Sequence, residues 1–211
     1  MDQANFSIEQ SRPYTVRVKI KGVAKMLLHC WQNEAIEEKA KAKKGSDIKK
    51  TDNLESYVER VKNPENPDFG KIVMPALNLC ASIASAAKSY TDKAAGKGKT
   101  MYSRVRACVV PGLEYGVINA GKEKRDESGN HTWDFVDSRR AVINRAGITR
   151  SRPAFNEGWE ITFDLLVLEP EYVAFELLHT LISDAGKFQG IGDFRPTFGR
   201  FRIESMNKIE D

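Results

Sequence analysis

Residues 190–201 read GIGDFRPTFGRF. This stretch of three glycines and two arginines follows an amphipathic segment and leads into one in which basic and apolar residues alternate. Apolar residues before this stretch recur at helical spacing, so we predict a helix over 171–186 that starts after Pro170 and ends at Gly186. After it, residues 200–203 alternate arginine with Phe or Ile, which predicts a short strand. A nucleotide-binding P-loop is excluded, because there the glycines precede the helix and a Lys-Ser/Thr pair closes the motif.

Three further segments have the two-residue period of a strand. Residues 14–22 and 103–110 alternate apolar with basic side chains, and residues 158–170 carry one apolar row. We predict strands at all three, and a helix over 74–90 whose small residues pack closely on a sheet. The mixed order of these elements, without regular βαβ units, predicts an α+β fold with an antiparallel sheet backed by helices.

The length of 211 residues is typical of one domain, so we expect 1–211 to form a single domain. Residues 36–70 are too rich in charge to build a core, and we interpret them as a long charged insertion after the first strand. The net charge of +4 favours acidic partners only weakly.

Cys30, Cys80 and Cys108 are odd in number and widely spaced, which argues against a structural disulfide or a zinc site. No run of apolar residues is long enough for a membrane span, and the first residues lack a signal pattern. We therefore expect a cytoplasmic protein without contact to membranes.

Basic residues gather on the polar faces of the expected strands and in residues 139–152, which hold five arginines and no acid. Cations that neutralise phosphates release counterions and so give salt-dependent binding of nucleic acid. Phe194 and Phe198 are candidates to stack on bases, whereas Trp159 and Phe201 fit a core better. The candidate nucleic-acid-binding residues in these segments are Arg17, Lys19, Lys21, Arg104, Arg106, Arg139, Arg140, Arg145, Arg150 and Arg152.

No spacing typical of a catalytic or metal site appears, so we predict no catalytic residue, no metal and no cofactor. His29 ends an apolar run and fits a packed or capping histidine. Asp193 fits a turn cap or a partner of Arg195 better than a chemical role.

The order strand, helix, glycine-rich loop and short strand over 158–203 resembles the last third of the RAMP superfamily, the ferredoxin-like, RNA-recognition-motif-related proteins of CRISPR effector complexes. Gly190-x-Gly192, a spacer with Arg195, and Gly199-Arg200 match the family's loop, although Phe201 stands where the family pattern has a glycine.

The resemblance implies a modified ferredoxin-like (RRM-like) fold that grips single-stranded RNA by its backbone, with 36–70 as a thumb-like insertion. Glycines without Cβ atoms let the chain approach phosphates closely. The loop residues that join the candidates are Gly190, Gly192, Arg195, Gly199 and Arg200.

These observations predict a single-stranded nucleic-acid-binding protein that forms a homo-oligomer or part of a multi-subunit ribonucleoprotein. A CRISPR backbone-like subunit and a stand-alone phage or mobile-element relative both fit, and RNA is favoured over DNA by the resemblance alone. One alternative is a RAMP-type endoribonuclease using His29, Asp47 or Asp52. Another is a phage structural, assembly or anti-defence protein that binds an acidic protein.

Overall fold

A computed structural model describes residues 12–30, 53–120, 124–127, 129–143 and 146–209, with the backbone alone at 141–143 and 146–148. Six of the elements, taken in chain order, are a strand, a helix, two strands, a helix and a strand; shorter elements and a hairpin lie between them in the chain. They are β1 (Tyr14–Gly22), α2 (Ala76–Ala86), β6 (Tyr115–Asn119), β9 (Glu160–Val167), α4 (Phe175–Asp184) and β10 (Phe201–Ile209).

These four strands lie in the order β10-β1-β9-β6, and all neighbours are antiparallel. The first strand therefore lies between the third and the last, as in a ferredoxin-like βαββαβ sheet. Beyond β6 the sheet continues through β4 (Ile72–Pro75) to β3 (Glu59–Arg60), and β5 (Val109–Pro111) pairs with β9.

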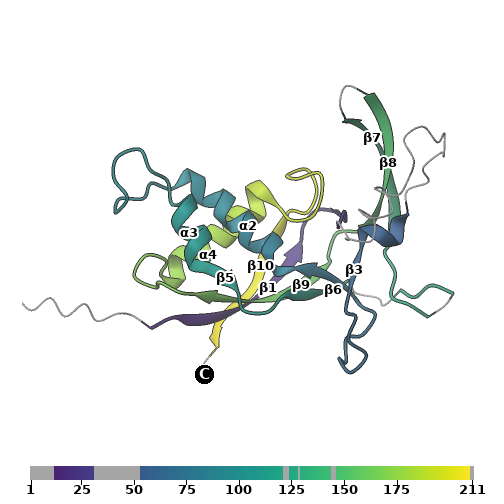
Figure 1. Ribbon diagram of the computed structural model, residues 1–211, viewed down its shortest axis with the longest axis horizontal. Coiled ribbons are helices and arrows are strands. Elements are labelled where there is room, and N and C mark those ends of the chain that lie inside the picture. The colour runs from purple at the N-terminus through teal and green to yellow at the C-terminus, as the bar shows by residue number, and fades with distance from the viewer. Residues whose placement is uncertain (1–11, 31–52, 121–123, 128, 144–145, 210–211) are drawn as a thin grey trace, which may run out of the picture.

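The helices α2, α4 and α3 (Tyr102–Cys108) cover one face of this sheet (Figure 1). The apolar rows predicted for 14–22 and 158–170 point into the core beneath them, which confirms both strands. The members of these rows are fully buried: Val16, Val18, Ile20, Ile161, Phe163, Leu165 and Val167.

A second sheet consists of β2 (Met26–Leu27), β8 (Ala146–Phe155) and β7 (Phe135–Ile143) in the order β2-β8-β7. The β7–β8 hairpin is inserted between β6 and β9 and rises away from the main sheet (Figure 1). The 3₁₀ turn η1 (Leu54–Tyr57) contacts β8. Of the expected insertion at 36–70, residues up to 52 lie outside the described part, and its role as a thumb stays a prediction.

The strand prediction for 103–110 is wrong, because α3 occupies most of this segment and β5 begins only at Val109. The alternation of Val105, Ala107 and Val109 spans too few residues to separate a strand from a helix. In the structure Val105 and Cys108, one helical turn apart, are buried, whereas Ala107 is exposed. Arg104 and Arg106 therefore belong to the helical layer.

Both predicted helices form, with different ends. Residues 72–75 continue the sheet as β4, so α2 begins at Ala76, and the 3₁₀ turn η2 (Ala87–Ser89) follows it. The helix α4 runs on into a π-helical turn η3 (Ala185–Gln189). Gly186 is thus not the helix end, and the positive φ of 71° occurs at Gly190.

The three cysteines are free thiols. In the described part of the chain, no helix combines the length and apolarity needed to cross a bilayer, and no three or more His, Cys, Asp or Glu side chains gather as a metal site would require.

Close packing explains why residue 186 is a glycine. A Cβ placed there would lie 2.3 Å from the carbonyl oxygen of Phe201, the first residue of β10. We predict that Gly186→Ala lowers the free energy of unfolding by about 1–3 kcal/mol, measured by urea denaturation, because η3 and β10 must separate to admit the methyl group. Lys187→Ala, at the exposed neighbouring position, is the control and should leave stability within about 0.5 kcal/mol. Equal stability of the two variants would contradict this explanation.

Candidate nucleic-acid interface

The basic face of β1 points away from the helices and is matched by acidic side chains on the neighbouring strand β9. Arg17 donates two hydrogen bonds of 2.8 Å to the carboxylate of Asp164. Lys19 and Lys21 both pair with Glu160, at 2.6 and 2.8 Å, and these hydrogen bonds lower the pKa of Glu160. Three cations thus share two carboxylates, so this face carries less free positive charge than the sequence indicates.

Arg104 and Arg106 do not join that face, because α3 lies on the opposite side of the sheet (Figure 1). The guanidinium of Arg104 pairs with Asp92 at 2.8 Å and stacks 3.9 Å from the ring centroid of Tyr172. Arg106 is exposed. The structure therefore separates the basic residues that the sequence analysis grouped on one surface.

The hairpin carries a second set of arginines, three of them on the face that meets the glycine-rich loop. Arg139 and Arg150 are cross-strand partners, and Arg152 lies two residues further along β8. Arg152 pairs with Asp193, Arg139 lies 4.5 Å over the ring of Phe198, and Arg150 donates to the Tyr57 hydroxyl at 3.4 Å.

Arg140 is exposed and lies on the opposite hairpin face, one residue out of phase. Arg145 lies outside the described residues.

The glycine-rich loop is held by backbone hydrogen bonds to the segment that contains β2. The Asp193 N–H donates to the carbonyl of Leu27 at 2.9 Å, and the Gly199 N–H to that of Lys25 at 2.7 Å. Gly199 has a φ of 73°, and a Cβ there would lie 1.7 Å from the carbonyl oxygen of Ile191. Protein backbone also fills the space beside Gly190 and Gly192. The glycines thus explain how the loop folds onto itself and onto β2.

Two exposed arginines, Arg195 and Arg200, accompany this loop. Phe194 is 36% exposed, with the guanidinium of Arg152 4.5 Å from its ring centroid. Phe198 is only 8% exposed and packs with Leu27 and Ala154, so it is a core residue. Trp159 and Phe201 are also buried, as predicted. We call Arg139, Arg150 and Arg152 with Phe194, Arg195 and Arg200 the hairpin–loop surface.

Asp193 lies at the centre of this region. Its Oδ2 accepts a hydrogen bond from Arg152 Nε, and the His29 Nδ1 lies 3.5 Å from the same oxygen. The other accepts the N–H of the next residue, Phe194, at 2.9 Å. Burial alone would raise the pKa of Asp193, but the hydrogen bonds of His29 and Phe194 and the charge of Arg152 lower it to about 2. Its ionic partner is Arg152 rather than Arg195.

A cavity of about 330 Å³ opens beside Asp193, and we call it the loop cavity. Its polar lining comes from five separate segments of the chain: His29, Cys30, Tyr57, Glu59, Asn78, Arg152 and Asp193. The rings of His29 and Tyr57 are in contact, with centroids 4.6 Å apart. Tyr57, Glu59 and Asn78 could not be assigned to a site from the sequence, because no motif links positions that meet only in the folded chain.

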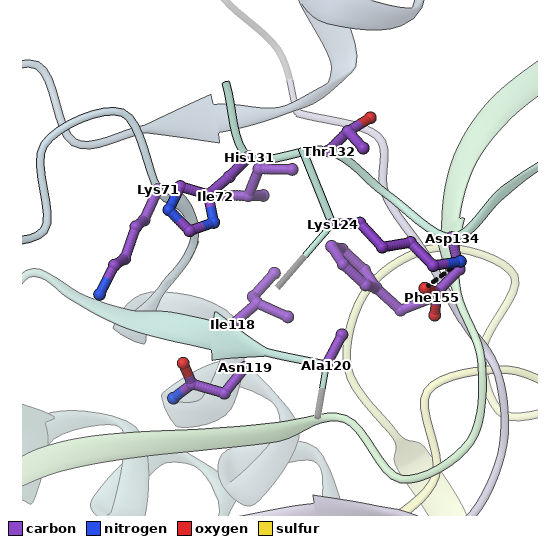
Figure 2. Close-up of a pocket in the computed structure, with 10 residues that line it drawn as sticks. All are labelled: Lys71, Ile72, Ile118, Asn119, Ala120, Lys124, His131, Thr132, Asp134 and Phe155. Atoms are coloured by element: carbon purple, nitrogen blue, oxygen red, sulfur yellow. Dashed lines mark ion pairs between the residues drawn. The ribbon is translucent and has the colours of Figure 1, made fainter. Parts of the chain in front are cut away.

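A smaller cavity of about 70 Å³ lies between β6 and the segment before β7 (Figure 2). Ile72, Ile118 and Phe155 form its apolar part, and the ammonium group of Lys124 reaches Asp134 at 3.0 Å. This volume holds at most a few water molecules, so the cavity is too small for a nucleotide.

The environment of Asp193 predicts a pH-dependent contribution to stability. Because its pKa falls from 3.8 to about 2 on folding, the carboxylate stabilises the fold above pH 3.8, and this contribution is lost as the pH falls through 2. We predict that Asp193→Asn lowers the free energy of unfolding at pH 7 by about 1–2 kcal/mol, less than for a fully buried pair because Asp193 is partly exposed.

Denaturation of both proteins at pH 7, 4 and 2 tests this prediction, with the difference expected to shrink toward pH 2. The control is Asp137→Asn, which removes a carboxylate paired with the exposed Arg139. If the free energy of unfolding lost in Asp193→Asn is the same at all three pH values, the proposed stabilisation by the Asp193 carboxylate is contradicted.

No family model and no curated protein matches the sequence. Among solved structures, the fold is similar to a chain in the cryo-EM structure of the Type III-B Cmr-beta complex bound to cognate target RNA, with a TM-score of 0.55 and 9% identity. The match covers 94% of this chain and 61% of that one, so this chain spans about three fifths of the length of the chain it matches. At this identity the similarity concerns the fold alone: antiparallel sheets with the helices α2, α3 and α4, in a ferredoxin-like arrangement.

Proposed function

We propose that this protein binds single-stranded nucleic acid, preferentially RNA, as a subunit of a multi-subunit ribonucleoprotein of the CRISPR effector type. The observation that carries the proposal is the hairpin–loop surface, where the arginines of β7 and β8 meet the glycine-rich loop. The fold similarity supports the choice of RNA, because the related chain belongs to a complex bound to target RNA.

The chemistry of this surface fits a nucleic-acid strand better than an acidic protein. Arg195 and Arg200 are exposed and make no ion pair with any described residue, so their charges remain available for phosphates. Phe194 offers a partly exposed ring beside them for stacking on a base. The nucleic-acid strand would lie along the junction between the hairpin and the main sheet. Self-assembly along such a strand stays part of this proposal.

The open face of the main sheet is a weaker candidate. Its cations are already paired with Asp164 and Glu160, so phosphates would have to displace carboxylates there. The Arg104 guanidinium is likewise held by Asp92 on the helical side. We therefore assign the main contacts to the hairpin–loop surface.

A second candidate function is RNA cleavage, because His29 lines the loop cavity together with Arg152. Histidine beside a cation is a combination used in general acid–base catalysis. The other residues of this hypothesis, Asp47 and Asp52, lie outside the described part of the chain. Absence of RNA cleavage by the wild type would eliminate this function, and cleavage that persists in the His29→Ala, Asp47→Ala and Asp52→Ala variants would eliminate these residues as its catalysts.

The loop arginines give the most direct test of binding. We predict that the double variant Arg195→Ala/Arg200→Ala binds a mixed-sequence single-stranded RNA about tenfold more weakly than the wild type. The magnitude of the slope of log affinity against log salt, measured by fluorescence anisotropy from about 50 to 200 mM, should fall by about 1.4, because two phosphate contacts to a single strand are lost.

The matched control is Lys93→Ala/Lys97→Ala, which removes the same charge from an exposed loop after η2, on the helical side of the molecule. This control should keep the wild-type slope. If both double variants lose the same affinity, net charge rather than the hairpin–loop surface governs binding. If the wild type does not bind RNA even at low salt, the proposal fails and an acidic protein partner becomes the better interpretation.

A further inference from the structure

We propose that the loop cavity binds one nucleobase of a single strand and prefers guanine. This inference rests on the proposed nucleic-acid binding and names the base that the cavity recognises. Three features of the cavity support it: two side chains with unused hydrogen-bonding atoms, an apolar and aromatic lining, and a position beside the glycine-rich loop.

The two hydrogen-bonding side chains are those of Glu59 on β3 and Asn78 in the first turn of α2. Glu59 Oε2 accepts a hydrogen bond from the Cys30 thiol at 3.6 Å. Glu59 Oε1 and the side-chain amide of Asn78 have no hydrogen-bond partner in the part of the chain that the structure describes. Both side chains are half-buried, and neither has an unpaired atom sealed off from solvent. These atoms are therefore accessible to a ligand in the cavity.

The chemistry of the lining favours a neutral ligand that carries N–H donors. Asp193, the other carboxylate of the cavity, already accepts hydrogen bonds from Arg152 Nε and the Phe194 N–H. The groups that remain are a carboxylate oxygen, which only accepts hydrogen bonds, and an amide, which both donates and accepts. An anionic group would be repelled by the carboxylates, whereas N–H groups on a ring would pair with Glu59.

Among the four RNA bases, guanine matches these two side chains best. Its Watson–Crick edge carries two adjacent donors, N1–H and the N2 amino group, next to the acceptor O6. Glutamate accepts hydrogen bonds from amino groups on base edges, and an asparagine amide donates to a base oxygen. Uracil has a single N–H between two carbonyl oxygens, so it would turn an acceptor toward Glu59. The cavity should therefore bind guanine more tightly than uracil.

The rest of the lining suits a flat ring. Leu28, Met74 and Pro75 contribute apolar surface, together with the rings of His29 and Tyr57, whose centroids lie 4.6 Å apart. The volume of about 330 Å³ lies at the lower end of small-ligand sites, roughly 300–1,000 Å³, as expected for a single nucleoside.

The cavity lies within reach of a strand on the hairpin–loop surface. Gly192 and Asp193 of the glycine-rich loop line it, and Phe194 and Arg195 follow them directly in the chain. The phosphates of a strand can thus contact the exposed arginines while one base turns out of the stack into the cavity. Proteins commonly recognise single-stranded RNA in this way, through the hydrogen-bonding edges of unstacked bases.

Fluorescence anisotropy with three labelled octamers tests the preference: all uridine, one central guanosine, and one central inosine. We expect the wild type to bind the guanosine octamer about tenfold more tightly than the uridine octamer, with inosine in between because it lacks the N2 amino group. The ratio between the octamers should be the same at about 50 and 200 mM salt, since neutral groups of the base make the difference and the phosphates do not.

Glu59→Gln tests the assigned residue. It replaces an acceptor oxygen by an amino group, so the preference for guanosine should fall below about twofold, while the melting temperature stays within about 2 °C of the wild type. The matched control is Glu65→Gln, which removes the same charge from an exposed position that does not line the cavity. This control should keep the full preference. The inosine comparison needs no variant and tests the site even if Glu59→Gln does not fold.

Equal affinity of the wild type for the three octamers would overturn the site and leave the proposed function intact. A preference for guanosine that survives in Glu59→Gln would also overturn it. If no octamer binds, the proposed function fails, and calorimetric titration with free guanosine and uridine decides about the site. Saturable binding of guanosine alone that Glu59→Gln abolishes supports the site, whereas no binding of guanosine at millimolar concentration overturns it as well.

Discussion

The ion pair between Arg152 and Asp193 links the two sheets of the molecule. Asp193 belongs to the loop between α4 and β10, whereas Arg152 belongs to β8 of the hairpin. Because the Arg152 side chain is almost fully buried, its charge must stay paired, and this fixes the position of the hairpin relative to the loop. The backbone hydrogen bond from Asp193 to Leu27 attaches the loop to the remaining strand of the same sheet. The hairpin–loop surface and the loop cavity both depend on this junction.

The distribution of charge follows from this architecture. On the open face of the main sheet, carboxylates of β9 compensate the cations of β1, an arrangement that keeps a solvated sheet soluble and in register. At the junction of the two sheets, Arg152 is paired with Asp193, whereas the exposed Arg195 and Arg200 have no carboxylate partner among the residues that the structure describes. Arginine and lysine side chains therefore have different roles at these two places, depending on whether the neighbouring segment supplies a carboxylate that pairs with them.

The sequence was sufficient for the elements with long, regular apolar periods. The rows of β1 and β9 and the stripe of α4 could be predicted because burial on one face requires them. The segment 103–110 could not, since a few alternating residues fit either α3 or a strand. The arginines of 139–152 were identified as candidates, but a run of arginines indicates a solvated surface, so the burial of Arg152 was not predictable. Its partner Asp193 lies 41 residues away, and no local pattern encodes that contact.

Photo-crosslinking most directly tests the claim that nucleic acid binds where the hairpin meets the glycine-rich loop. The wild-type protein would be irradiated with RNA containing 4-thiouridine, and the cross-linked peptides identified by mass spectrometry. The account predicts cross-links within residues 135–155 and 190–201. Cross-links confined to α3 or to the open face of β1 and β9 would contradict it.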